Sequence, residues 1–217
     1  MKRLETSWLG SVPYREALEL QTELQAARVN REIDDTLLLL EHQHVYTIGR
    51  RGSADDVLWD VEMLRARGVE VVEADRGGMV TYHGPGQLVG YPIIDLGAGA
   101  DLVRYLRRLE DALISTLASY GLQGERDSAN TGVWVGSAKI AAIGVRVARN
   151  VTKHGFALNV STDLSYFAGI VPCGITDRGV TSMAVELGGA PTLEDAAARF
   201  EDMFVQVFGY DRARVAS

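Results

Sequence analysis

The chain has 217 residues, of which 47% are hydrophobic and 24% are charged, and these fractions exclude a coiled coil, a collagen and a disordered tail. Its length predicts a single domain over residues 1–217, with a small C-terminal subdomain from about residue 189 as the alternative. The net charge of −7 argues against nonspecific binding to nucleic acid or to an anionic membrane, because both need a cationic surface. One cysteine and the lack of a long apolar segment near the N-terminus predict a cytoplasmic protein.

Apolar periodicity and end signals predict three amphipathic helices. The first follows Pro13, because the fixed φ of proline suits the first turn of a helix. The second has Asp101 as its N-cap and stops at Gly121, and we expect its apolar stripe to pack on a sheet. The third begins after Thr192 and ends at Gly209.

Short apolar segments predict the strands of that sheet. They are Thr36–His42, Val69–Glu73, Gln87–Ile94, Gly132–Gly136, Lys139–Ala148 and Lys153–Val160. The first of these segments is continuously apolar, which predicts a strand buried on both faces. Because the strands cluster instead of alternating strictly with helices, the predicted fold class is α/β with a mixed, largely antiparallel sheet flanked by helices.

Cys173 is the first candidate for chemistry, in the sequence Val171-Pro-Cys-Gly-Ile175. The glycine that follows it leaves the next backbone N–H open, so a thiolate here would have a donor for a developing oxyanion beside it. The alternative is a small buried apolar side chain, which is the commonest state of a lone intracellular cysteine.

Lys139 is the second candidate, because it is one of only three lysines and opens an apolar run. On a strand, alternation places it on the face shared with Ala141 and Ile143, where its ammonium would be desolvated. Such a lysine can act as a base or lower the pKa of a nearby thiol. The alternative is a strand-end lysine with its ammonium in solvent.

The glycine-rich segment 76–86 contains Arg76 and His83 and predicts a binding wall that a ligand approaches closely. Its alternative is a pair of turns around a short strand. His42 and His44 lie two residues apart, but a metal pair is disfavoured because the segment has neither a cysteine nor a third histidine.

A basic window is the last feature. The residues from Ser128 to Thr162 include no acid, whereas Arg146, Arg149 and Lys153 all fall among them. This pattern predicts either a docking patch for an acidic macromolecule or an ordinary solvated face.

Five sequence blocks, taken in order, carry a resemblance to a known family. They are Glu41–Gly49, Arg76–Pro92, Gly132–Val135 with Lys139–Gly144, His154–Val160, and Pro172–Ile175 with Val180–Ser182. Together they resemble the lipoyl(octanoyl) transferase family, whose members depend on acyl carrier protein and make protein-bound octanoyl-lysine for lipoate synthesis. A matched cysteine and lysine within five ordered blocks are more specific than one glycine-rich segment alone.

The resemblance implies the fold of the biotin and lipoate protein ligase catalytic domain, with Cys173 as the acyl-accepting nucleophile and Lys139 lowering its pKa. It implies octanoyl-acyl carrier protein as the donor, and lipoyl domains of 2-oxoacid dehydrogenases and the glycine cleavage H protein as acceptors. It also implies that neither a cofactor nor a metal is needed. The substrate-binding residues that it implies are Arg76, Gly77, Gly78, Met79, Val80, Thr81, Tyr82, His83, Ala142, Ile143, Gly144, Gly155, Phe156 and Ala157.

Two other functions remain as alternatives at this point. An ATP-dependent lipoate or biotin-type protein ligase on the same fold would activate a free acid as an acyl-adenylate, and that chemistry has no use for a nucleophilic cysteine. An acyl-binding protein without catalysis would leave Cys173 inert. The sequence has no phosphate-binding Gly-x-x-x-x-Gly-Lys-Ser/Thr motif, which agrees weakly with a transferase.

Overall fold

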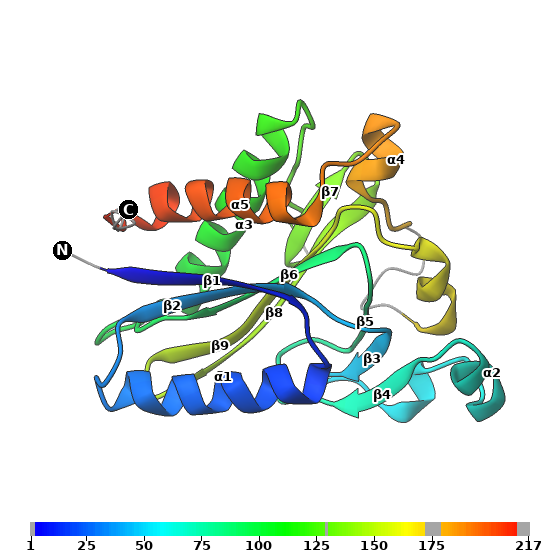
Figure 1. Cartoon of the computed structure of the whole chain (residues 1–217), viewed down its shortest axis with the longest axis horizontal. Helices are drawn as coiled ribbons and strands as arrows, with labels where there is room; N and C mark the ends of the chain where they lie inside the picture. Colours follow the sequence, from blue (N-terminus) through cyan, green and yellow to red (C-terminus); the bar gives the residue numbers. More distant parts are fainter. Residues whose placement is uncertain (1–2, 129, 172–178, 212–217) are drawn as a thin grey trace.

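The computed structural model describes residues 3–128, 130–171 and 179–211, and two β-sheets lie at the centre of this part of the chain (Figure 1). The larger sheet has the strands β1 (Leu4–Ser11), β2 (Asp35–Glu41), β6 (Gln87–Ile93), β7 (Gly132–Val135), β8 (Ala138–Ala148) and β9 (Val151–Asn159). Their spatial order is β1-β2-β6-β9-β8-β7. The β1–β2 pair is parallel, and every other neighbouring pair is antiparallel.

Helices cover both faces of the larger sheet. The long ones are α1 (Tyr14–Val29), α3 (Leu102–Ser119) and α5 (Leu193–Phe208). α1 lies along one face, and α3 and α5 lie across the other (Figure 1). The leucine run of β2 contributes to both layers, because Leu37 and Leu39 pack with α3 and α5 whereas Leu38 and Leu40 pack with α1.

The smaller sheet has the order β4-β3-β5, with β3 parallel to β4 and antiparallel to β5. Its strands are β3 (Val45–Ile48), β4 (Glu70–Glu73) and β5 (Val80–His83). The shorter helices of the structure are η1 (Ala54–Asp56), α2 (Val61–Ala66), η2 (Leu164–Gly169) and α4 (Met183–Leu187). The core of this sheet is aromatic: Tyr46 and Tyr82 are fully buried, and the rings of Tyr82 and Tyr166 stack with centroids 5.0 Å apart.

The glycine-rich segment joins the two sheets. It includes β5 of the smaller sheet and leads directly into β6 of the larger one. Gly86 makes this junction with a φ of 79°, and its carbonyl accepts hydrogen bonds from the N–H groups of Val160 and Ser161. A Cβ at Gly86 would lie 2.7 Å from Ser161 Oγ, so only glycine fits without displacing the chain that follows β9.

The structure confirms the predicted fold class and the three long helices. Asp101 Oδ1 accepts from the N–H of Arg104 at 3.0 Å and Thr192 Oγ1 accepts from the N–H of Asp195 at 3.1 Å, as expected of N-caps. All six predicted strands are present within two residues of their expected bounds, and the last three are antiparallel neighbours. The sequence analysis missed β1, β3, α2 and α4, which are edge or short elements with weak apolar periodicity.

The residues after position 188 contribute α5, whose Phe200 and Phe204 belong to the same core as Leu88 of β6 and Leu158 of β9. None of the described helices combines the length and the apolar character that crossing a bilayer requires.

Candidate active site

A cavity of about 460 Å³ lies between the glycine-rich segment and the strands β8 and β9, a volume within the usual range for small-ligand pockets. It brings together three segments that are distant in the sequence. The predicted substrate-binding residues that line it are Arg76, Gly77, Gly78, Val80, Thr81, His83, Ala142, Ile143, Gly144, Gly155, Phe156 and Ala157. Met79 and Tyr82 are not among the lining residues. Tyr82 instead packs in the aromatic core, and its hydroxyl is hydrogen-bonded to His44 Nδ1 at 2.8 Å.

Backbone hydrogen bonds hold the glycine-rich wall on both sides. The N–H of Gly77 donates to the carbonyl of Val145 at 3.0 Å, and the N–H of Arg51 donates to the carbonyl of Gly78 at 3.0 Å. A Cβ at Gly144 would lie 2.9 Å from the carbonyl oxygen of Gly77. Glycine at 144 therefore allows the wall and β8 to come into direct backbone contact.

Arg76 anchors the same wall to the smaller sheet. Its guanidinium donates to the carbonyl oxygen of Thr47 at 2.6 Å and to Thr47 Oγ1 at 2.7 Å. The side chain is 7% exposed and lines the cavity. Arg76 thus serves as a buried clamp between β3 and the cavity wall.

Lys139 lines the cavity on β8 and is 9% exposed. Its Nζ lies 4.7 Å from the centroid of a ring of Trp134, a cation–π contact. Ala141 lies in the large core and Ile143 packs against it, but Ile140 belongs to the same core, so strict alternation does not hold at this end of β8, where the register with β7 shifts. The alternative of a strand-end lysine with its ammonium in solvent is therefore wrong.

Cys173 lies outside the described residues. The described chain resumes at Gly179, whose carbonyl accepts from the N–H of Lys139 at 3.0 Å, and the N–H of Thr181 donates to the carbonyl of Lys139 at 2.9 Å. Val180, between these two partners, lines the cavity. Lys139 is thus paired with a segment that begins six residues after Cys173 in the sequence.

A chain of buried hydrogen bonds leads from the glycine-rich segment to the partner of Lys139. His83 Nδ1 is bonded to Gln87 Oε1 at 2.8 Å, Gln87 Nε2 donates to Asn159 Oδ1 at 2.9 Å, and Asn159 Nδ2 donates to the carbonyl of Thr181 at 2.9 Å. Burial, with the neighbouring cations, lowers the pKa of His83 well below its usual value, so the ring is neutral at pH 7. A neutral ring with its proton on Nδ1 satisfies Gln87 Oε1.

The sequence analysis missed Gln87 and Asn159 as site residues, although both stand within the quoted blocks. The side-chain amide of a glutamine or an asparagine does not indicate a functional role until the groups that it contacts are known. It also missed Tyr14, which lines the cavity and has a buried hydroxyl with no hydrogen-bond partner among the described residues. Burial raises the pKa of Tyr14 to about 12, which leaves a neutral hydroxyl that can donate to a ligand or a water.

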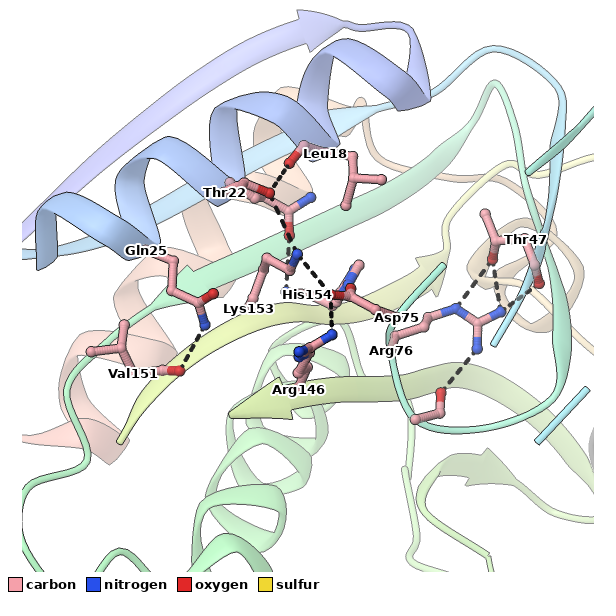
Figure 2. Close-up of polar contacts among 12 residues, drawn as sticks. Leu18, Thr22, Gln25, Thr47, Asp75, Arg76, Arg146, Val151, Lys153 and His154 are labelled. Atoms are coloured by element: carbon pink, nitrogen blue, oxygen red, sulfur yellow. Dashed lines mark hydrogen bonds and ion pairs between the residues drawn. The ribbon is translucent and has the colours of Figure 1, made fainter. Parts of the chain in front are cut away.

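The basic window is not the exposed patch that one alternative predicted. Lys153 is 5% exposed, and its Nζ lies 3.0 Å from Asp75 Oδ2 beneath α1 (Figure 2). Arg146 contacts the same carboxylate oxygen at 2.5 Å. A docking role for Lys153 is therefore wrong, because its ammonium is already paired and buried. Arg149 is exposed at the turn between β8 and β9.

The histidines of the first block have protein partners. His42 is fully buried, with Nδ1 2.7 Å from the carbonyl oxygen of Val12 and Nε2 2.7 Å from the hydroxyl of Tyr91. His44 is bonded to Tyr82. Within the described ranges, no group of three or more histidine, cysteine, aspartate or glutamate side chains is arranged to hold a metal ion.

Comparisons with known proteins show which family this chain is similar to. The family model described as the lipoyl protein ligase A/B catalytic domain matches residues 13–205. The octanoyltransferase of Chloroflexus aurantiacus is 53% identical over 215 residues, covering 97% of this chain and 96% of the relative. The octanoyltransferase of Solibacter usitatus is 51% identical over 210 residues, covering 96% and 94%.

Solved structures show the same fold at low sequence identity. The bi-partite lipoate protein ligase of Thermoplasma acidophilum has a TM-score of 0.76 at 15% identity, over 97% of this chain and 86% of that one. The biotin protein ligase of Aquifex aeolicus, in complex with biotin and ATP, has a TM-score of 0.59 at 13% identity, over 94% and 70%. On the family match and the full-length relatives, this chain belongs to the lipoyl protein ligase A/B catalytic domain family.

Proposed function

We propose that this chain transfers an octanoyl group from octanoyl-acyl carrier protein to a lysine of lipoyl domains, through a thioester on Cys173. The observation that carries the proposal is the cavity walled by the three predicted acyl-binding segments, with Lys139 on its lining. It occurs in a chain that is 53% identical, over nearly its full length, to an octanoyltransferase. The acceptors would be lipoyl domains of 2-oxoacid dehydrogenases and the glycine cleavage H protein, which together with the donor imply a cytoplasmic enzyme.

In the first transfer, the thiolate of Cys173 attacks the carbonyl carbon of the donor thioester, and the bond from that carbon to the carrier's sulfur breaks. The leaving sulfur takes a proton from the ammonium of Lys139. The products are octanoyl-Cys173, the free carrier thiol and a neutral Lys139. An ammonium near Cys173 would favour the thiolate that starts this step.

In the second transfer, a neutral ε-amine of the lipoyl domain attacks the same carbonyl carbon, and the bond to Cys173 breaks. Neutral Lys139 takes the proton that the attacking nitrogen loses as the amide forms. The products are octanoyl-lysine, the Cys173 thiolate and the Lys139 ammonium, so the site returns to its starting state. Since a thioester is already activated, the two steps balance without ATP.

The cavity suits an aliphatic chain. Val80, Ile143 and Phe156 lie among its lining residues. Each CH₂ group that leaves water for such a surface contributes about 0.8 kcal/mol. An octanoyl chain therefore has enough apolar carbon to bind here without a charged anchor.

The ATP-dependent ligase is the second candidate, and the similarity to solved ligases is the observation in its favour. That similarity rests on 13% and 15% identity, which supports the fold alone. The relatives at 51% and 53% identity are octanoyltransferases. The transferase is therefore the function that the comparisons favour.

The donor docks at Arg50 and Arg51 in this proposal, instead of at the buried Lys153. Both arginines are exposed, and Arg51 lines the cavity. In the described residues neither arginine takes part in an ion pair. Acyl carrier proteins are typically acidic, so the exposed Arg51 on the cavity lining and its neighbour Arg50 are complementary to the donor.

The test is intact-protein mass spectrometry after brief mixing with octanoyl-acyl carrier protein, without ATP. We expect an octanoyl adduct on the wild type and none on Cys173→Ser. An adduct on both proteins would remove Cys173 as the acyl acceptor. The opposite result would be no adduct on the folded wild type, with modification of a lipoyl domain only when ATP and free octanoate are added. That result would establish the ligase instead.

A further inference from the structure

Asp75 stands immediately before the glycine-rich segment and is not among the residues that line the cavity. Its carboxylate is shared by three side chains of the β8–β9 hairpin (Figure 2). Oδ2 lies 2.5 Å from Arg146 Nη1 and 3.0 Å from Lys153 Nζ, and Oδ1 lies 2.6 Å from His154 Nε2. One carboxylate therefore connects the start of one cavity wall to both strands of the other.

The backbone of β9 departs from regular strand geometry so that this cluster can form. In a regular strand Lys153 and His154 would point to opposite faces, yet both reach the Asp75 carboxylate. His154 has a φ of 60°, in the left-handed region that few residues other than glycine adopt. Its backbone N–H donates to Gln21 Oε1 at 2.9 Å while its ring contacts Asp75, so α1 and Asp75 together hold this conformation.

His154 itself lines the cavity, and the other members of the cluster are close in sequence to residues that line it. Gly77, two residues after Asp75, is bonded to Val145, the residue before Arg146. Gly155 directly follows His154 and is paired with Gly144 across the hairpin. Movement of Asp75 away from the hairpin would therefore separate the glycine-rich wall from the β8–β9 wall.

The cluster is mostly shielded from solvent. The side chains of Lys153 and His154 are 7% and 2% exposed, that of Asp75 is 33% exposed, and that of Arg146 is 40% exposed. The two hydrogen bonds to the buried partners are therefore screened by salt less than a surface pair would be. These bonds, and not the exposed Arg146 contact, carry most of the restraint.

We infer that Asp75 is a positioning residue of the acyl cavity, whose carboxylate fixes the glycine-rich wall against the β8–β9 wall and so sets donor affinity and chain-length preference. This inference rests on the proposed function, because it assumes that the cavity holds an acyl chain. A displacement of about 1 Å in such a wall is enough to cost up to about 100-fold in reaction rate.

The test compares Asp75→Asn with Asp35→Asn. Asp35 is a matched control, because it is a buried carboxylate paired with Arg28 at 2.7 Å and with the hydroxyl of Tyr210 at 2.8 Å, and it does not line the cavity. KM and kcat are measured with octanoyl and decanoyl thioesters of N-acetylcysteamine, beside the Tm of each variant. We expect Asp75→Asn to raise KM for the octanoyl donor about 10- to 100-fold and to reduce the preference between the two chain lengths, with Asp35→Asn unchanged in both.

A second variant keeps the inference testable if Asp75→Asn fails to fold because Lys153 is left buried and unpaired. Asp75→Asn combined with Lys153→Met removes that unpaired cation. We expect this double variant to recover Tm but to keep the raised KM. Recovery of wild-type KM and chain-length preference together with Tm would show that Asp75 only supports folding and would overturn the inference.

Failure of the proposed function would be seen separately, as the absence of an acyl adduct on the wild type. Calorimetric binding of the octanoyl thioether analogue of the donor then serves as the readout. Weaker binding by the double variant than by the wild type and Asp35→Asn supports the inference. Equal binding by all three proteins overturns it.

Discussion

In the proposed mechanism, Lys139 acts in two protonation states within one catalytic cycle. As an ammonium it would favour the Cys173 thiolate, and as a neutral amine it would take the proton from the acceptor lysine. Its position suits both states, because the side chain is 9% exposed yet its Nζ rests on a Trp134 ring 4.7 Å away. Burial disfavours the charged form of the side chain, whereas the aromatic ring stabilises it.

Substitution of Lys139 is expected to separate the two transfers. Lys139→Arg keeps a cation but cannot supply a neutral base, so acylation should stay within about tenfold of wild type while the acyl-enzyme accumulates. Lys139→Met removes both functions and should slow acylation about 100-fold. Rapid-quench mass spectrometry of the octanoyl-enzyme measures both steps. Wild-type turnover by Lys139→Arg would contradict a base at this position.

His42 predicts a dependence of stability on pH. Burial lowers its pKa from 6.5 to about 4, so between these values the unfolded chain binds a proton that the folded chain excludes. Stability should therefore fall as the pH falls through this window, by about 1.4 kcal/mol for His42 between pH 7.5 and 5.5. Burial lowers the pKa of His83 as well, which adds a loss of the same sign.

The measurement is the free energy of unfolding in urea at pH 7.5, 6.5 and 5.5. Asp75 does not contribute to the change in stability over this pH range. The hydrogen bond from His154 holds the pKa of the Asp75 carboxyl below its usual value, so the stability that this carboxylate provides is lost only at lower pH. An unfolding free energy that is flat over the three pH values would show that His42 is protonated inside the fold.

At the scale of elements, the site depends on how closely β6 and β9 approach each other. Gly90 of β6 is the register partner of Phe156 of β9, and a Cβ at the neighbouring Gly155 would lie 2.1 Å from the carbonyl oxygen of Gly90. Gly90 also makes room for Phe156, which lines the cavity. The ring of Phe156 lies 4.2 Å, centroid to centroid, from that of Phe200 of α5, so it has little freedom to retreat.

Gly90→Ala is therefore expected to destabilise the protein by about 1–3 kcal/mol through overpacking against Phe156. Gly189→Ala is the matched control, because a Cβ there meets nothing within 4 Å, and its effect should stay within about 0.5 kcal/mol. Urea unfolding of both variants measures the difference. Equal stability of the two variants would mean that Phe156 can move aside.

At the scale of the whole molecule, the proposed function requires a chain of net charge −7 to bind an acidic carrier. Two cations of the basic window, Lys153 and Arg146, are paired with Asp75, and Arg149 is exposed at the β8–β9 turn without lining the cavity. Arg51 is exposed and lines the cavity, and its neighbour Arg50 is exposed as well. The positive charge near the cavity, and not the net charge of the chain, would then attract the acidic carrier.

Arg51→Glu is expected to raise KM for octanoyl-acyl carrier protein about tenfold at low salt, with a smaller effect at high salt. KM for an octanoyl thioester of N-acetylcysteamine should not change, because that donor lacks the acidic carrier. Arg149→Glu makes the same charge reversal at the exposed β8–β9 turn and should leave both values unchanged. A larger effect of Arg149→Glu than of Arg51→Glu would locate docking at the hairpin instead.

The sequence by itself determined the long helices, the six stronger strands and the family. These features rest on local signals: caps such as Asp101 and Thr192, the leucine run of β2 that is buried on both faces, and five sequence blocks in a fixed order. Such signals can be recognised in the sequence because a helix cap or an apolar stripe acts on residues only a few positions away. The edge strand β1 and the short strand β3 lacked such signals and depend on their neighbours for order.

Only the tertiary structure decided which polar residues meet. The sequence before Lys153 is typical of an exposed turn, yet this side chain is buried beneath α1 and against Asp75. Gln87 and Asn159 became site residues because β6 and β9 are hydrogen-bonded neighbours, which places these two side chains 2.9 Å apart across 72 positions of the chain. Such contacts depend on sheet order and on the φ of single residues, and neither is encoded in a local pattern of residue types.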